Sequence, residues 1–291
     1  MNKDKNVGGS FLINETDFHD VFIKSDFNDT DKEMLAATRE FRNKEIIPHL
    51  KDLEKHNYKL VESIIQKAGQ LGLLGLNIPE EYGGFGMGFN LSMLICGEMS
   101  ADSGSVATAY GAHTGIGTYP ILYYGSEEIK KKYLPKIASG EWISCYNLTE
   151  PNAGSDANSG TTKAILKNEN YEISGQKIWI SNAGFAEVFI VFAKIEDDEN
   201  ITGFVLEKSQ TNGIILGEEE KKLGLNSSST RQVFFDKSII NKTQLLGERN
   251  GGFKIAMNAL NVGRIKLCAA TIAASEKILN ISIEYALERK Q

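Results

Sequence analysis

The sequence has little of what marks disulfide-rich, zinc-binding or membrane proteins. Its three cysteines, Cys96, Cys145 and Cys268, lie far apart and form no Cys-x-x-Cys pair. This spacing argues against a disulfide framework and a zinc site, and it favours a reducing, cytoplasmic location. No apolar run approaches the roughly 20 residues that span a bilayer, and the opening MNKDKNVGGSF lacks the apolar core of a signal peptide. We therefore expect no transmembrane segment and no bound metal.

Positive charge and nucleotide-binding loops are also scarce. Lysine and arginine total 32 against 38 aspartate and glutamate, which gives a net charge of −6. Because nucleic-acid partners require a basic face, we expect none. No Gly-x-Gly-x-x-Gly loop leads from a strand into a helix, so any bound nucleotide would need other contacts. The remaining composition, 41% hydrophobic and 24% charged, is that of a globular chain with room for two or three domains.

The order of local patterns predicts an α+β multidomain chain. A polar arm over 1–28 precedes an α-helical domain over 29–140, whose first helix has a capping-box pattern at Thr30 and Glu33 and a break near Pro48. Short β-rich runs separated by Gly, Asn and Asp then predict a β-barrel or sandwich over 141–248, with a hairpin turn at Asn168–Asn170. The helical pattern returns over 249–291 as the start of a C-terminal α-helical bundle.

The last helical segment is apolar on nearly all sides. Isoleucine, leucine and alanine residues are spread around it from Ile265 to Ile283, a pattern typical of a helix buried within a bundle. The segment could dock on the N-terminal helices or on a second copy of the chain. The interpretation we favour is that further helices follow Gln291 and that the chain is C-terminally truncated.

Two turn-rich stretches stand at the junction of the helical and β-rich regions. LTEPNAGSD ends at Asp156, and KIWISNAG follows one hairpin later. A cluster of Gly, Ser, Asn and Asp is in most proteins only a turn. Here the two stretches come in order with LGLLGLNIPEEYGGFG, KYLPKIASGE, GFKIAMNALNVGRI and YALERKQ, and the whole set resembles the acyl-CoA dehydrogenase family, most closely its very-long-chain branch.

The resemblance implies a reaction and its participants. It implies α,β-dehydrogenation of an acyl-CoA thioester in fatty-acid β-oxidation, with FAD as cofactor and an electron-transferring flavoprotein as acceptor. The cofactor would do the redox chemistry while the protein supplies orientation and electrostatics. The resemblance also implies a homo-oligomer, dimer or tetramer, for the full-length protein.

The resemblance also assigns the cofactor contacts. The expected FAD-binding residues are Tyr146, Asn147, Leu148, Thr149, Gly154, Ser155, Trp179, Ile180, Ser181 and Arg289. Backbone groups and small hydroxyls would bond the ring and the pyrophosphate, and the flat face of Trp179 would pack against the ring. An isolated tryptophan is more commonly a core residue. Arg289 would reach the phosphates of the neighbouring subunit's FAD, although a late-helix arginine is also a common solvated charge.

The expected substrate-binding residues also come from the resemblance. Acyl-CoA contacts are expected at Ser155, Asn261, Arg264, Ala107 and Gly111. Ala107 and Gly111 share one helix face, and their small size would leave room for a long acyl tail; the same pair is also compatible with tight helix packing. Arg264 could alternatively belong to a buried structural ion pair. His113, which lies nearby, is expected to be structural.

The family's catalytic glutamate has no counterpart at the matching positions. A minority of members carry it immediately before the arginine that matches Arg264, where this sequence has Gly263. Neither Glu141 nor Glu150 is an adequate substitute by resemblance, so no catalytic residue is assigned. We expect the base to lie beyond Gln291 and this chain to be nearly inactive. The alternatives are an acyl-CoA oxidase or flavin monooxygenase of the same fold, or a non-catalytic protein that binds FAD or acyl-CoA.

Overall fold

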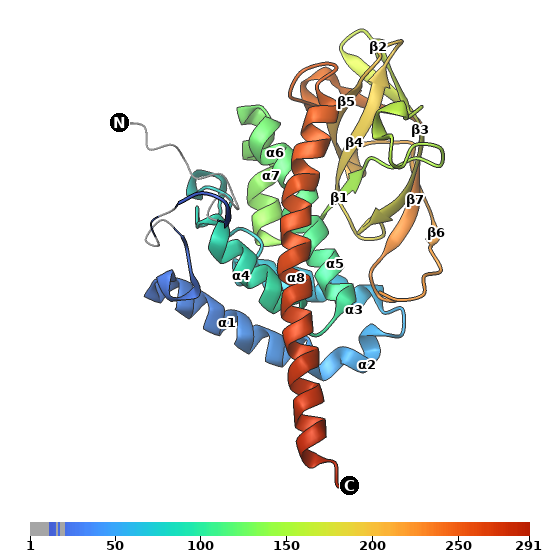
Figure 1. Ribbon diagram of the computed structural model, residues 1–291. Coiled ribbons are helices and arrows are strands. Elements are labelled where there is room, and N and C mark those ends of the chain that lie inside the picture. The colour runs from blue at the N-terminus through green and yellow to red at the C-terminus, as the bar shows by residue number, and fades with distance from the viewer. Residues whose placement is uncertain (1–11, 16, 18–20) are drawn as a thin grey trace.

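The computed structural model describes residues 12–15, 17 and 21–291, so much of the predicted arm lies outside the described residues. The N-terminal half is helical (Figure 1). Its helices are α1 (Asp29–Glu45), α2 (Leu50–Leu53), α3 (Tyr58–Gln70), α4 (Phe89–Ser100), α5 (Gly104–Gly111), a π-helical turn η6 (Ala112–Ile116), α6 (Tyr119–Tyr124) and α7 (Glu127–Ser139).

Residues close in sequence determine where helix α1 begins and ends. Its N-cap is Asn28, whose side chain accepts from the Asp31 backbone N–H at 2.9 Å while Asp31 bonds back to Asn28. The prediction of a capping box at Thr30 and Glu33 was therefore wrong by two residues. An amide oxygen is as good an N-cap acceptor as a hydroxyl, so both sites compete in sequence. The predicted break near Pro48 is confirmed, because α1 ends at Glu45.

The second region is one mixed sheet of eight strands. The strands are β1 (Ser144–Asn147), β2 (Lys163–Lys167), β3 (Asn170–Ser181), β4 (Val188–Ile195), β5 (Ile201–Glu207), β6 (Ile214–Glu219), β7 (Thr230–Asn241) and β8 (Leu245–Leu246). Their order is β6-β7-β3-β2-β4-β5-β8, and β1 pairs with β4. Both β1 and β2 run parallel to β4, and the other pairs are antiparallel. The predicted hairpin turn lies between β2 and β3, where Asn168 has a φ of 57°.

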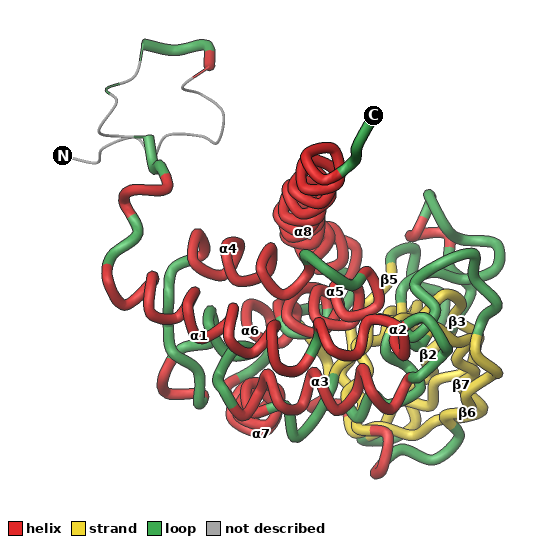
Figure 2. The backbone as a smooth tube through the Cα atoms, turned by 90° about the horizontal axis from the view of Figure 1, so that it is seen from below, coloured by secondary structure: helices red, strands yellow, loops and turns green. Residues whose placement is uncertain are grey.

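A single long helix, α8 (Gly252–Glu288), runs along both regions (Figures 1 and 2). Its first turns belong to a core cluster in which Ile255 packs with Leu134 of α7 and Val205 of β5. Further along, Gly97 of α4 lies against α8 so closely that a Cβ there would be 3.2 Å from the Ala269 carbonyl oxygen. Beyond this point α8 projects from the body, and its isoleucines and leucines from position 278 onward are about half exposed or more.

The predicted fold class is confirmed: a helical N-terminal domain, a central β domain and a C-terminal helix follow one another. The central domain is a mixed sheet whose inner residues form a core of their own, including Phe189, Phe204 and Val233. Across the described part of the chain, no helix combines the length and hydropathy needed to cross a bilayer. In the same residues, no cluster of His, Cys, Asp and Glu side chains is placed to hold a metal.

Candidate functional site

A cavity of about 370 Å³ lies where β1 and β3 meet the first turns of α8. We call it the hydroxyl-lined cavity. Eight of the predicted cofactor residues line it: Tyr146, Leu148, Thr149, Gly154, Ser155, Trp179, Ile180 and Ser181. None of the hydroxyls of Thr149, Ser155 and Ser181 has a hydrogen-bond partner among the described residues. They remain available to a ligand that carries hydrogen-bonding groups.

Trp179 owes its position in this cavity to an irregularity in β3. The pairing register between β3 and β7 shifts between Lys177 and Ile180, which is the mark of a β-bulge. Trp179 has a φ of 60°, a conformation that is unusual for a bulky side chain, and 59% of the residue is exposed. The neighbouring Ile178 N–H donates to the Thr149 carbonyl at 2.9 Å. The bulge is thus fastened to the cavity's other wall and turns the indole out of the core.

A buried ion pair fixes the two walls to each other. The Lys177 ammonium lies 2.7 Å from a Glu150 carboxylate oxygen and 3.1 Å from the Leu148 carbonyl, and the two side chains are only 1% and 4% exposed. The carboxylate also accepts from the backbone N–H groups of Thr161 and Thr162 at 2.6 and 3.1 Å. Burial by itself would raise the pKa of Glu150, but these donors and the ammonium hold it at about 2.

A second cavity, also of about 370 Å³, opens beside the first. We call it the apolar cavity because its exposed lining is mostly carbon. It lies between α5 and α8 and includes Ala107 and Gly111, which were both predicted from sequence to shape an acyl site. A Cβ built on Gly111 would meet no atom within 4 Å, so this glycine faces open space. The two cavities share five lining residues: Ala112, Ile116, Ser181, Leu260 and Arg264.

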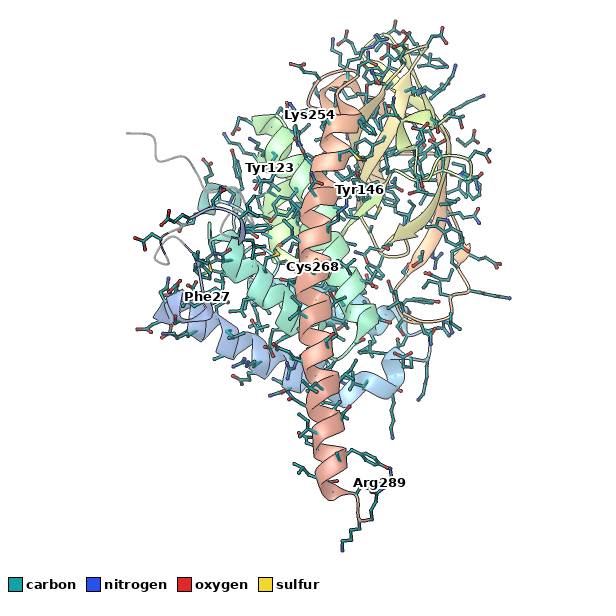
Figure 3. The ribbon with its side chains drawn as sticks, in the orientation of Figure 1. Phe27, Tyr123, Tyr146, Lys254, Cys268 and Arg289 are labelled. Atoms are coloured by element: carbon teal, nitrogen blue, oxygen red, sulfur yellow. The ribbon has the colours of Figure 1, made fainter. Side chains whose placement is uncertain are left out.

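Three predicted residues do not line either cavity. The Asn147 side chain is fully buried and donates to the Ile190 carbonyl at 3.2 Å, away from the hydroxyl-lined cavity. Asn261 is exposed and accepts from Arg264 at 2.6 Å. Arg289 lies at the free end of α8, far from Tyr146 in the same chain (Figure 3). Arg264 is exposed rather than held in a buried ion pair, and it lines both cavities.

His113 has a structural environment, as expected. It is fully buried; its Nδ1 accepts from the Ser144 backbone N–H at 3.1 Å, and its Nε2 lies 3.1 Å from the Ile137 carbonyl. This pairing requires a neutral ring protonated on Nε2. Burial lowers the pKa of His113 to about 4, although the bond to the Ile137 carbonyl opposes the shift.

The buried neutral histidine predicts an acid-labile fold. The unfolded chain binds this proton near the ordinary pKa of 6.5 and the folded chain only near 4, so stability falls as pH drops through that window. We expect His113 to account for a loss of up to about 3 kcal/mol in the free energy of unfolding between these limits. Urea unfolding at a series of pH values measures it. The slope should shrink in His113→Gln and persist in His56→Asn, which changes an exposed residue; equal slopes in both variants would contradict the assignment.

Several site residues were missed by sequence reasoning. Met257 and Leu260 of α8 line the hydroxyl-lined cavity, and Lys266 lines the apolar one. Lys177 was also missed, although a lysine followed on a strand by Ile178 and Trp179 is a signal that a buried partner is needed. Its partner, Glu150, enters the sequence prediction only as an inadequate substitute for the catalytic base.

Three consecutive segments of the chain match models of known protein domains. Residues 28–141 match the N-terminal domain of acyl-CoA dehydrogenase, residues 145–238 its middle domain, and residues 250–291 its C-terminal domain. Together these matches cover most of the chain, so it belongs to the acyl-CoA dehydrogenase family.

Individual relatives agree with this placement. A probable acyl-CoA dehydrogenase of Bacillus subtilis is 43% identical over 290 residues, which are 99% of this chain and 48% of the relative. A short-chain-specific acyl-CoA dehydrogenase of Clostridium acetobutylicum is 37% identical over 91% of this chain and 71% of its own length. The crystal structure of a Bacillus anthracis acyl-CoA dehydrogenase complexed with FAD superposes with a TM-score of 0.93 at 43% identity, over 98% of this chain and 50% of that one. The chain thus spans about half the length of the first relative and of the solved structure.

Proposed function

We propose that this protein binds FAD in the hydroxyl-lined cavity and an acyl-CoA tail in the apolar cavity. These are the two ligands of an α,β-dehydrogenation, for which the described lining residues supply no carboxylate base. The main support for the proposal is the wall that the two cavities share. A polar cavity with unbonded hydroxyls and an exposed indole adjoins an apolar one, and Ser181, Arg264 and three apolar side chains line both. A flavin ring and a saturated chain would meet at that wall.

The chain's own residues would bind and orient both ligands. Thr149, Ser155 and Ser181 offer hydrogen bonds, and Trp179 offers a flat apolar face at the cavity's rim. FAD, when bound, supplies the two-electron oxidation that the amino acids cannot. Leu260 and Ile116 would exclude water from the junction of the two cavities.

The finer parts of the proposal concern substrate and partners. Open space beside Gly111 supports a long-chain acyl group in fatty-acid β-oxidation, within the very-long-chain branch. We further propose an electron-transferring flavoprotein as acceptor and a homo-oligomer in which Arg289 reaches the FAD of a second copy. Three free cysteines, two of them buried, support a reducing, cytoplasmic location.

Replacing Trp179 with alanine tests the cofactor site. We expect the Kd for FAD to rise roughly 10-fold to 100-fold, because the rim loses its largest apolar face. Equilibrium dialysis of FAD measures the change. The matched control is Trp142→Phe, since Trp142 packs on the core next to Tyr133 and lines neither cavity. An unchanged Kd in Trp179→Ala would place the flavin elsewhere.

A further inference from the structure

Lys266 is a buried cation whose position the proposed function does not explain. It lies on the inner face of α8 and is 3% exposed. Its ammonium donates to the Thr114 hydroxyl at 3.0 Å and stands 5.6 Å from the centre of the Tyr110 ring. Within the described residues it has no carboxylate partner and no second hydrogen-bond acceptor.

This arrangement costs free energy unless something else contacts the ammonium. An ammonium has three N–H donors, and only one of them is used here. An unpaired buried charge destabilises a fold by several kcal/mol, and burial accordingly lowers the pKa of Lys266. The simplest alternative is a neutral amine that serves only as a partner for Thr114.

The position of Lys266 argues for contact with a ligand. It is one of the residues that line the apolar cavity, together with Ala107 and Gly111. The neighbouring Gly115 leaves room for it, because a Cβ there would lie 3.3 Å from the Lys266 Cδ. A larger residue at that place would crowd the lysine side chain.

Lys266 lines the apolar cavity but not the hydroxyl-lined one, so it lies outside the wall that the two cavities share. Arg264 and Ser181 line both cavities, whereas Lys266, Cys96 and Ala107 line only the apolar one. No carboxylate of the described residues lines that cavity, and burial raises the pKa of the Cys96 thiol there, which favours its neutral form. A ligand that entered from the shared wall would therefore bring its far end toward Lys266.

We propose that Lys266 forms a subsite for a carboxylate at the distal end of the acyl chain, so that the preferred ligands are ω-carboxyacyl-CoA thioesters. The carboxylate would accept hydrogen bonds from the two unused N–H groups of the Lys266 ammonium and supply the missing counter-charge. This inference rests on the proposed function, because it takes the apolar cavity to be the acyl site.

The test compares paired ligands on the FAD-loaded protein. Hexanoyl-, decanoyl- and hexadecanoyl-CoA are each titrated by calorimetry beside the ω-carboxyacyl-CoA of the same length. We expect the ω-carboxy form to bind at least about 10-fold more tightly than its plain partner at the length that reaches Lys266. In Lys266→Met this preference should vanish or reverse. The control Lys254→Met changes an exposed lysine on the same helix and should keep it (Figure 3).

The outcomes separate the two proposals. Plain acyl-CoA binding without any preference for the ω-carboxy form, at every length, overturns the subsite and leaves the proposed function standing. A preference that survives in folded Lys266→Met places the carboxylate at another residue and overturns it equally. If no acyl-CoA of either kind binds, the proposed function fails and the subsite with it. The wild-type comparison decides the matter even if the variant does not fold.

Discussion

Replacing Lys177 with methionine is expected to abolish FAD retention and to lower the free energy of unfolding by about 3–5 kcal/mol. The substitution leaves the Glu150 carboxylate buried without its counter-ion and the Leu148 carbonyl without a donor. Leu148 lines the hydroxyl-lined cavity, and Glu150 directly follows Thr149, which lines it too. Urea unfolding measures the first effect, and flavin absorbance after gel filtration measures the second.

A double variant separates the effect of the buried charges from the effect of side-chain shape in the pair of Lys177 and Glu150. Lys177→Met combined with Glu150→Gln removes both charges, so it should recover a large part of the lost stability, while FAD retention recovers less. The matched control is Lys163→Met, whose ion pair with Asp197 is exposed and should contribute under about 1 kcal/mol. If Lys177→Met behaves like that control, the buried pair does not organise the site.

The second large effect is an absence of turnover. The FAD-loaded 291-residue protein is expected to show no flavin bleaching with any acyl-CoA under anaerobic conditions. No described residue that lines either cavity carries a carboxylate, and a positioned base contributes about 10²–10⁴-fold to proton removal. The full-length Bacillus subtilis relative serves as the comparator, and dithionite should bleach both proteins. Rapid bleaching by the 291-residue protein would refute the missing base.

Gly263→Glu is the matching gain-of-function variant. Gly263 lines the apolar cavity, and a Cβ there would meet only the Ile116 methyl at 3.3 Å. A carboxylate at this place would lie beside Arg264, at the position a minority of the family uses for its base. Slow bleaching in Gly263→Glu, where the parent protein shows none, would confirm that the ligands are correctly placed and that only the base was lacking.

Much of the lining of the hydroxyl-lined cavity could be predicted because it comes from two short stretches of the sequence. The order of Thr149, Gly154 and Ser155 in one stretch, with Trp179 and Ser181 in the next, is local information. Asn147 is a different case. Successive residues on a strand point to opposite faces, so with Tyr146 in the cavity the Asn147 side chain must turn into the sheet. Strand alternation applied to β1 would have predicted this from the sequence.

Other features depend on long-range pairing and could not be predicted. The bulge that turns Trp179 outward exists because β3 shifts its register against β7, about 50 residues away in the chain. The pair of Lys177 with Glu150 joins segments on either side of a hairpin, and neither residue alone specifies the other. The burial of Lys266 likewise follows from where α4 and η6 pack on α8.

The two tryptophans give the protein a pair of internal optical probes. The chain has only Trp142 and Trp179. Trp142 is partly covered by the core and lies under the Lys136 ammonium, 3.8 Å from its ring centre, so its emission follows unfolding. Trp179 stands at the rim of the hydroxyl-lined cavity, so its emission follows whatever enters. With Trp142→Phe, quenching of the remaining indole becomes a direct, label-free signal of occupancy, separate from any loss of the fold.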